Sequence, residues 1–395
     1  MNRIVVTGLG VISAIGNSVA ENRVSLVEGK CGISPLQMFP SKFAGKLPVG
    51  EIKISNEALK EKLNAPEPAV TRTTLLALHA IKEALADSGL TSAEISSGDT
   101  ALVGASTVGG MCLTDEMYLD SQIDTLGSPY LLSYDFSATN MYLQKYFSIG
   151  GLVNTINTAC SSSANAIMYG ARLISSGRST RAIVGGFDSL AKFTINGFNA
   201  LHILSADYCT PFDEERKGLN LGEGAAFIVL EKEADATGKK IYATLSGYAN
   251  ANDAFHASSL SDNGDGPYKA MKDALASANL HPAQIDFINA HGTGTQNNDQ
   301  VESIALLRIF KKVPAFASTK ANTGHTLGAA GAIEALYCIL NLAEQELYPS
   351  LHFKNPIAST GLVPFQLYKK KSLQNIMSNS FGFGGNCSSL IFSKT

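Results

Sequence analysis

Charged residues are scarce in this chain: 16% of its 395 residues are Asp, Glu, Lys or Arg, while 45% are hydrophobic. Soluble proteins average about 25% charged residues, so this composition predicts a compact globule and excludes a disordered chain. The formal net charge of −3 gives no overall basic field, so binding to nucleic acid or to anionic lipid is not predicted. The three consecutive lysines at 369–371 are interpreted as a solvated turn.

Disulfide bonds are not indicated either, because the six cysteines form no CxxC pair and show no regular spacing. We therefore predict reduced thiols and a cytoplasmic location. Four of the six are interpreted as small packing residues: Cys31, Cys112, Cys209 and Cys338.

Long apolar runs and phosphate-binding motifs are also missing. No run of about 18 apolar residues occurs, so a membrane span is not predicted. The G-x-x-x-x-G-K pattern is absent, and Gly8 and Gly10 lack the third glycine of a dinucleotide site. The apolar stretch 4–15 imitates a signal peptide, but its glycines and the β-branched residues at 4–7 favour a strand, a turn and a further element.

A duplication relates the two halves of the chain at one constant offset. The segment 82–95 matches 272–285 at half of its positions, and Gly89 coincides with Asn279, the two residue types that best tolerate a left-handed helix cap. Each copy predicts a helix, a cap, a turn and a strand, at 101–104 in the first and 285–288 in the second. Because single cores stop growing at about 250–300 residues, we predict two similar α/β halves, 1–238 and 239–395.

A second correspondence predicts two central helices. A strand-like segment at 152–156 leads into Cys160 and the small-residue stretch 161–174. In the same way, 315–318 leads into the segment 320–325 and then the stretch 328–342. Helices rich in Ala, Ser and Gly can approach each other closely, so we place both in the central layer and expect Cys160, Lys320 and His325 to converge.

Cys160 is the candidate nucleophile. It lies in Thr-Ala-Cys-Ser-Ser-Ser, after a predicted strand and at the start of a predicted helix. Unpaired N–H groups and the helix dipole favour negative charge there, so we expect a lowered thiol pKa and high reactivity. The alternative is a buried packing residue.

Two histidines are candidates for stabilising the negative charge that develops on a carbonyl oxygen. His291 lies in Ala-His-Gly-Thr-Gly-Thr and His325 in Lys-Ala-Asn-Thr-Gly-His, each at a strand end where a side chain can face a cavity. Neutral imidazoles can donate N–H bonds to an oxygen that is becoming an enolate, and no metal is needed. Zinc held by Cys160, His291 and His325 is an alternative, but the spacing typical of zinc ligands is missing.

Lys320 is expected to be buried, because its neighbours are small, and a buried cation needs a partner. Asp299 and Glu302 are the predicted partners, with exposed helix carboxylates as the alternative. The segment 380–385, Ser-Phe-Gly-Phe-Gly-Gly, is too glycine-rich for a regular strand. Its backbone can approach a ligand closely, and one of its amides is a candidate for half of an oxyanion hole.

These segments together resemble the elongating, Cys-His-His type of β-ketoacyl-acyl carrier protein synthases, which have the thiolase fold. The resemblance runs from Val-Val-Thr-Gly-Leu-Gly-Val at 5–11 to the segment 379–385, and it includes Pro-Phe-Asp at 211–213, Arg216, Gly218 and Gly-Glu-Gly at 222–224. It implies a five-layered αβαβα sandwich of two pseudo-repeated halves. The implied reaction joins an acyl thioester to malonyl-acyl carrier protein, giving a 3-oxoacyl product and CO2.

The resemblance also implies roles for individual residues. Cys160 would accept the acyl chain, His291 and His325 would bind the malonyl thioester carbonyl, and Lys320 would support them. The amides of Cys160 and Phe383 would form the oxyanion hole, with the Phe383 ring as a gate. Further implied residues are the acidic pair Asp299 and Glu302 and the pocket residues Phe198 and Val108.

The expected partners are an acyl carrier protein and a second copy of the chain, with no metal or other cofactor. Basic residues such as Lys60, Lys62 and Arg72 are candidates for docking the acidic carrier, or are ordinary surface charges. Two departures from the family pattern are a short loop at 205–210 without its usual basic residue, and Asn-Cys at 386–387. The alternatives are a silent chain-length partner in a heterodimer, which retention of Cys160 disfavours, and a thioester hydrolase.

Overall fold

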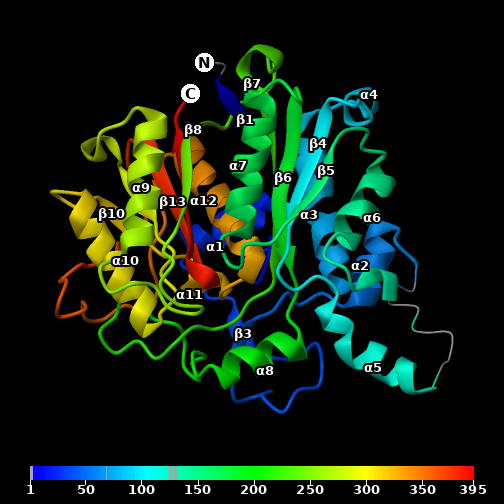
Figure 1. Ribbon diagram of the computed structural model, residues 1–395, viewed down its shortest axis with the longest axis horizontal. Coiled ribbons are helices and arrows are strands. Elements are labelled where there is room, and N and C mark those ends of the chain that lie inside the picture. The colour runs from blue at the N-terminus through cyan, green and yellow to red at the C-terminus, as the bar shows by residue number, and fades with distance from the viewer. Residues whose placement is uncertain (1–2, 68, 124–127, 129–130) are drawn as a thin grey trace.

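The computed structural model describes residues 3–395 apart from 68, 124–127 and 129–130. Its main sheet has the strand order β10-β9-β13-β14-β8-β1-β7-β6-β4-β5 (Figure 1). These strands are β1 (Ile4–Ser13), β4 (Thr100–Ala105), β5 (Val153–Ile156), β6 (Arg181–Asp188), β7 (Gly224–Lys232), β8 (Ala243–Asn252), β9 (Phe287–Asn289), β10 (Ala315–Ala317), β13 (Asn375–Gly382) and β14 (Asn386–Ser393).

The two halves of the sheet have the same topology. Read from each outer edge inward, the strands of a half follow the order third, second, fourth, fifth, first. In both halves the third, second and fourth strands are parallel, and the fifth is antiparallel to its two neighbours. The halves join where β1 pairs with β8, at Val5 with Thr244 and Val6 with Ala243. The predicted pair of repeated halves is confirmed, while the division at residue 238, between β7 and β8, stays a prediction.

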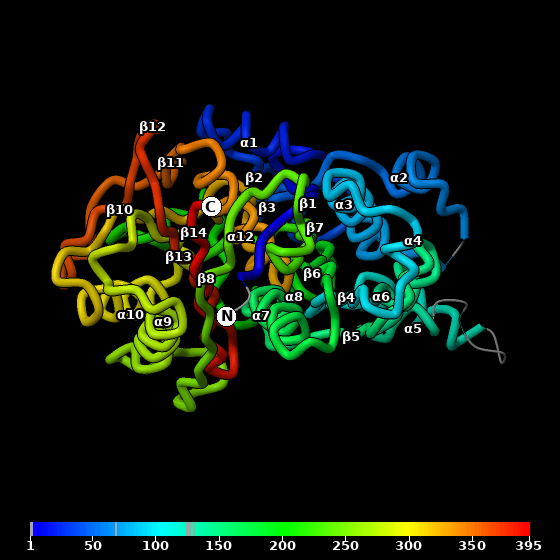
Figure 2. The backbone as a smooth tube through the Cα atoms, turned by 90° about the horizontal axis from the view of Figure 1, so that it is seen from above, coloured from blue at the N-terminus to red at the C-terminus, as the bar shows by residue number. Residues whose placement is uncertain are grey.

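Helices fill both outer faces and the space between the halves (Figures 1 and 2). In the centre, α7 and α12 contact each other and strands of both halves. Outside, α3 covers β1 and β7, and α9 covers β8 and β14, so the layers run α, β, α, β, α as expected. The helices are α1 (Val19–Val27), α2 (Asn56–Leu63), α3 (Arg72–Ser88), α4 (Ser92–Ile95), α5 (Thr114–Ile123), α6 (Ala138–Phe147), α7 (Ser162–Ser175), α8 (Lys192–Ala200), α9 (Asp265–Ala278), α10 (Gln296–Ile309), α11 (Lys320–Thr323) and α12 (Ala330–Glu344).

The repeated helix caps form as predicted. Gly89 ends α3 and Asn279 ends α9, both in the left-handed conformation with φ of 64° and 54°. The strand that follows each cap is also present, although β9 begins at Phe287, two residues later than expected. The short turn Pro282–Gln284 occupies the intervening residues.

Three local predictions were wrong. The strand at the N-terminus does not turn at its glycines but continues to Ser13, because Gly8 and Gly10 lie directly against the backbone of α3. The glycine-rich segment is strand as far as Gly382, and only 383–385 form a short 3₁₀ turn. Lys369–Lys370 form the exposed strand β12, which pairs with β11 (Glu346–Leu347).

A further pair of short strands outside the main sheet is β2 (Ile33–Pro35) with β3 (Pro48–Gly50).

One described segment, Leu327–Glu344, is long and apolar enough to cross a membrane by length and composition alone. It contains α12, and 89% of it is buried inside the protein. Its apolar character is explained by its place in the central layer, where every side is covered by protein.

Substituting Gly10 by Ala is predicted to destabilise the fold. An added Cβ would lie 2.0 Å from the Ala80 carbonyl oxygen, so the α3 backbone must move. Overpacking of this kind costs about 1–3 kcal/mol, and we expect a lower thermal unfolding midpoint. Gly98→Ala is the control, since a Cβ there meets no atom within 4 Å. Equal midpoints for the two variants would contradict this account.

Candidate active site

Cys160 stands on a sharp turn between β5 and α7. The preceding residue, Ala159, has a φ of +53°, a left-handed conformation that is unfavourable for a residue with a Cβ. The turn is held by Ser162, whose hydroxyl donates to the Ala159 carbonyl and accepts from the Thr158 N–H. The helix begins two residues beyond Cys160, so the sulfur lies beside its N-terminus.

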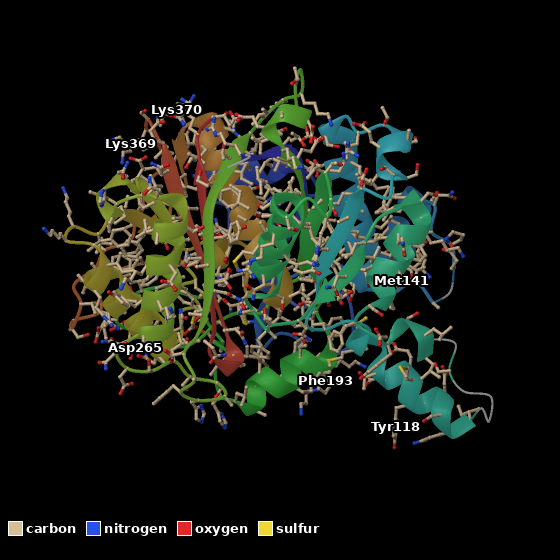
Figure 3. All side chains as sticks on the ribbon, turned by 45° about the horizontal axis from the view of Figure 1, so that its top comes forward. Tyr118, Met141, Phe193, Asp265, Lys369 and Lys370 are labelled. Atoms are coloured by element: carbon tan, nitrogen blue, oxygen red, sulfur yellow. The ribbon has the colours of Figure 1, made fainter. Side chains whose placement is uncertain are left out.

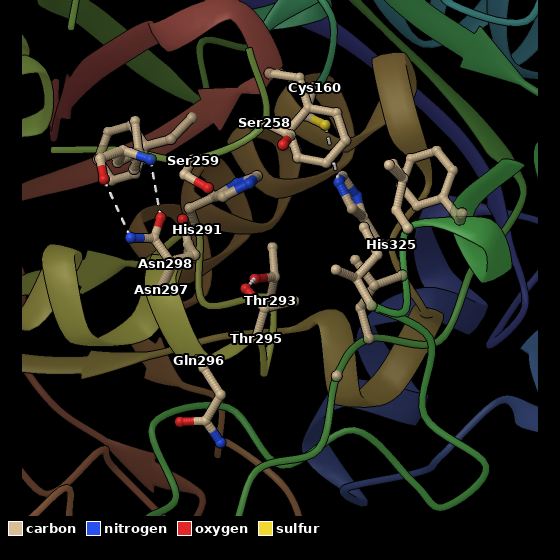
Figure 4. Close-up of a pocket in the computed structure, with 18 of the residues that line it drawn as sticks. Cys160, Ser258, Ser259, His291, Thr293, Thr295, Gln296, Asn297, Asn298 and His325 are labelled. Carbon is tan, nitrogen blue, oxygen red and sulfur yellow. Dashed lines mark hydrogen bonds between the residues drawn. The ribbon is translucent and has the colours of Figure 1, made fainter. Parts of the chain in front are cut away.

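The two predicted histidines meet the thiol in one place, as Figure 4 shows. The Nε2 atom of His325 lies 3.0 Å from the Cys160 sulfur. The rings of His291 and His325 are perpendicular, with centroids 5.5 Å apart. All three side chains are almost fully buried, with 7% of Cys160 and 2% of each histidine exposed.

Lys320 is buried beneath the histidines and is 1% exposed. Its Nζ donates to the His291 carbonyl oxygen at 2.6 Å and lies 3.2 Å from His291 Nδ1. An ammonium group can only donate, so Nδ1 accepts, and the ring proton of His291 is left on Nε2.

The predicted acidic partner of Lys320 was wrong. Its ion pair is with Glu334 of α12, at 2.5 Å. Burial raises the pKa of Glu334 to about 7, and the Lys320 charge opposes this effect. A signal was available, because Glu334 is a single acid within the apolar stretch 330–340, and such an acid needs a partner when buried.

Asp299 and Glu302 act on the backbone around His291 instead. Glu302 accepts hydrogen bonds from the N–H groups of His291 and Gly292, at 3.0 and 2.9 Å. Asp299 accepts from the N–H groups of Phe212 and Gly294. Burial raises the pKa of both carboxyl groups, that of Glu302 to about 7. The alternative of exposed helix carboxylates is excluded, since both are fully buried.

The predicted lowering of the thiol pKa was also wrong. Burial raises the pKa of Cys160 to about 11, although the Lys320 charge and hydrogen bonds from the Phe383 and Cys160 amides oppose it. Desolvation therefore outweighs the helix terminus at this sulfur. Burial also holds the pKa of both histidines well below the ordinary value, and the Lys320 charge adds to this effect. The resting pair is a neutral thiol and a neutral imidazole.

The glycine-rich segment brings Phe383 against the nucleophile. A Cβ at Gly382 would lie 2.9 Å from the Thr158 carbonyl oxygen and 3.0 Å from the Cys160 nitrogen, so only glycine permits this approach. The amides of Phe383 and Cys160 both form hydrogen bonds to the sulfur, and their role as the two oxyanion donors stays a prediction. The Phe383 ring stacks on Phe198, with centroids 5.9 Å apart.

A cavity of about 350 Å³ leads to these side chains. Figure 4 shows Thr293, Thr295 and Gln296 along one wall, with Ser258 and Ser259 nearby. Asn297 holds the segment that carries Ser258 and Ser259 through two hydrogen bonds to the Leu260 backbone. Phe198 lines the cavity as predicted.

Val108 does not line this cavity. It is 1% exposed and belongs to the apolar cluster with Leu190, Ile195 and Leu327, against which Phe198 packs. Among the described residues, no group of three or more His, Cys, Asp or Glu side chains is arranged to hold a metal ion.

The three basic residues considered for carrier docking differ in exposure. Arg72 is buried and pairs with Glu223 through two hydrogen bonds, so it is not a docking residue. Lys62 is exposed. The Nζ of Lys60 donates to the Glu67 carbonyl oxygen at 3.1 Å.

Comparison with known proteins identifies relatives over the whole chain. The family model described as the β-ketoacyl synthase N-terminal domain matches residues 1–236, and the β-ketoacyl synthase C-terminal domain matches 242–354. A putative mitochondrial 3-oxoacyl-[acyl-carrier-protein] synthase of Schizosaccharomyces pombe is 34% identical, covering 100% of this chain and 99% of the relative. The 3-oxoacyl-[acyl-carrier-protein] synthase 1 of Haemophilus influenzae is 33% identical over the same shares.

Solved structures with the same architecture include two that pair a ketosynthase with a chain length factor. The ishigamide ketosynthase/chain length factor has a TM-score of 0.94 at 28% identity, covering 100% of this chain and 99% of the other. The ketosynthase (ApeO) in complex with its chain length factor (ApeC) from Xenorhabdus doucetiae has a TM-score of 0.88 at 30% identity, covering 100% and 98%.

The raised thiol pKa predicts how Cys160 responds to alkylation. Because the thiol is protonated at neutral pH, the thiolate fraction should grow by about tenfold per pH unit until the pKa is approached. We expect the rate of Cys160 modification by iodoacetamide to rise from about pH 7 to beyond about pH 9 without a plateau. Intact-mass measurement follows the reaction, with Cys160→Ala as control for other thiols. A plateau in the acidic range would reveal a thiolate–imidazolium pair and contradict the neutral resting state.

Proposed function

The chain belongs to the β-ketoacyl synthase family, and we propose that it condenses an acyl thioester on Cys160 with malonyl-acyl carrier protein. The products are 3-oxoacyl-acyl carrier protein and CO2, as in fatty acid or related polyene and polyketide elongation. The chain is thus an acyltransferase. The observation that carries the residue assignment is the meeting of one thiol and two imidazoles at the end of a single cavity.

In the first stage the acyl group moves from the carrier's pantetheine sulfur to Cys160. The Cys160 sulfur attacks the thioester carbon while His325 Nε2, 3.0 Å away, takes the thiol proton. The amides of Cys160 and Phe383 receive the developing oxyanion. The pantetheine sulfur then leaves and takes the proton, so the charge balance is restored.

In the second stage malonyl-acyl carrier protein enters the same cavity. Its thioester oxygen accepts an N–H bond from His291 Nε2. His325, which no longer faces a thiol once Cys160 is acylated, donates a second one after its ring proton has exchanged from Nδ1 to Nε2. Loss of CO2 leaves an enolate, whose carbon attacks the acyl-enzyme and forms the new carbon–carbon bond. The Cys160 sulfur departs as a thiolate and takes one proton from the solvent, which restores the thiol. The scheme needs no metal or other cofactor, because loss of CO2 drives the step.

Lys320 and Phe383 have supporting roles in this proposal. Burial keeps both imidazoles neutral and the Lys320 charge adds to this effect. The Lys320 ammonium also fixes the proton of His291 on Nε2. The Phe383 ring, stacked on Phe198 beside the thiol, is the gate between the cavity and the apolar cluster behind it. Asp299 and Glu302 position the loop that carries His291.

We further propose that two copies of the chain associate. β5 is the outermost strand of one sheet edge, and an uncovered edge invites pairing. Large apolar side chains are also exposed on and after α5, including Ile123 at 85% and Leu132 at 87%. Figure 3 shows Tyr118 of α5 and Met141 of α6 on the outer surface. The cytoplasmic location stays a prediction, supported by six free cysteines.

Loss of the Cys160 thiol is predicted to abolish acyl transfer. We expect an intact-mass increase equal to the acyl group when the protein is incubated with acyl-acyl carrier protein, and none for Cys160→Ala. Cys387→Ala, which removes another buried thiol, is the control. An acyl adduct on the Cys160→Ala variant would refute the assigned nucleophile.

The same reaction mixture separates the alternatives. With malonyl-acyl carrier protein added, a 3-oxoacyl product made by the purified chain excludes a silent partner subunit. Release of free acid in place of that product would indicate a hydrolase.

Association is predicted to depend on α5. We expect light scattering to give twice the mass of one chain, and the double variant Leu119→Glu, Ile123→Glu to give a single chain, because burying two carboxylates in an interface is unfavourable. Leu367→Glu is the control, since Leu367 is 77% exposed on the C-terminal region. A wild-type protein that is monomeric alone would contradict the proposed homodimer.

A further inference from the structure

We infer that Asp188, a fully buried carboxylate outside the predicted site, is a positioning residue that sets His325 against Cys160. It is the last residue of β6, and its side chain accepts hydrogen bonds from two separate segments. One segment follows β4, and the other follows His325. The inference rests on the proposed condensation reaction and adds a residue to it.

The first segment wraps around the carboxylate after β4. The Ser106 and Thr107 hydroxyls each donate to Asp188 at 2.6 Å. The N–H groups of Thr107 and Val108 donate at 3.0 and 2.9 Å. Asp188 therefore fixes the turn behind the apolar cluster into which Val108 packs.

The second segment is the one that positions the histidine. The N–H of Gly328, three residues after His325, donates to Asp188 Oδ2 at 2.7 Å. A Cβ at Gly328 would lie 2.8 Å from the same oxygen, so the segment approaches as closely as its backbone allows. On its other side, the backbone of His325 bonds to Asn220 and Gly222.

The backbone between these two anchors is strained. Leu327 has a φ of +53°, which a leucine adopts only when its surroundings impose it. Its side chain is buried in the apolar cluster and its neighbour Gly328 is tied to Asp188. Without that bond Leu327 can relax to an ordinary conformation, and the His325 ring, two residues away, would leave its 3.0 Å contact with the sulfur.

Asp188 also acts on the thiol through its charge. The groups that face the Cys160 sulfur are the imidazoles of His291 and His325, the Lys320 ammonium and, more remotely, the Asp188 carboxylate. The negative charge of Asp188 raises the pKa of Cys160, after the larger effect of burial. When the carboxylate is neutralised, the loss of positioning therefore predicts slower acyl transfer, whereas the loss of charge predicts a lower Cys160 pKa.

Asp188→Asn tests both consequences at unchanged side-chain size. The amide keeps one acceptor oxygen. Oδ1 accepts from the fixed N–H groups of Thr107 and Val108, so we expect the amide oxygen there and the amide nitrogen facing Gly328, which then loses its acceptor. We expect single-turnover acyl transfer to Cys160 to slow by about 10- to 100-fold, with KM for the carrier unchanged. Iodoacetamide modification of Cys160 should shift towards lower pH. General damage to the fold would not produce slower acyl transfer together with a lower Cys160 pKa.

Asp286→Asn is the matched control. Asp286 is also a carboxylate that accepts two backbone N–H bonds, from Gln374 and Asn375, but it lies before β9, at the end opposite to His291. We expect wild-type transfer rates and an unchanged alkylation profile. An equal loss of rate in both variants, or wild-type transfer in Asp188→Asn, would overturn the inference.

Gly328→Ala is a second variant that keeps the charge and serves if Asp188→Asn does not fold. Its Cβ would push against Asp188 Oδ2, so transfer should slow while the alkylation profile stays that of the wild type. Wild-type transfer in this variant would also overturn the inference. If the unmodified protein accepted no acyl group at all, the proposed function would fail, whereas these comparisons concern only how Asp188 acts within it.

Discussion

The ion pair of Lys320 and Glu334 is the interaction on which the site depends. A buried ammonium group is tolerated only with a compensating carboxylate, and Glu334 supplies it from the second turn of α12. The same ammonium holds His291 through its ring nitrogen and its carbonyl oxygen. Burial keeps both imidazoles neutral and the Lys320 charge adds to this effect, while the same charge opposes the larger effect of desolvation on the Cys160 thiol. One cation thus acts on all three of these groups.

Burial is the constraint that this cation works against. A sealed cavity strengthens every hydrogen bond to a developing oxyanion, but it also makes a free thiolate unfavourable. The structure resolves this conflict by geometry, since His325 is placed to take the proton only when the sulfur attacks. The thiol therefore keeps its proton at neutral pH until it attacks a substrate.

Short-range patterns in the sequence predicted the two similar α/β halves and the meeting of the thiol with the imidazoles, whereas the five-layered sandwich was implied by the family resemblance. The matching caps at Gly89 and Asn279 and the small-residue stretches after Cys160 and Lys320 are visible in the chain itself. The partners of these side chains were harder to predict. Glu334 stands out as a single acid in an apolar stretch, but the sequence does not show that it pairs with Lys320, 14 residues earlier in another helix. Asp188 bonds to Gly328 across 140 residues, and only the packing of the layers reveals this pair. The thiol pKa was wrong for the same reason, since desolvation depends on everything that surrounds the sulfur.

The mirrored strand order divides the work between the two halves. The third strand of each half leads to a reactive group: β5 to the thiol of Cys160, and β10 to the ammonium of Lys320. The two copies of one scaffold thus supply different groups, a thiol from the first half and a cation with two imidazoles from the second. Neither half holds the complete set, so the site exists only where the second half has packed against the first.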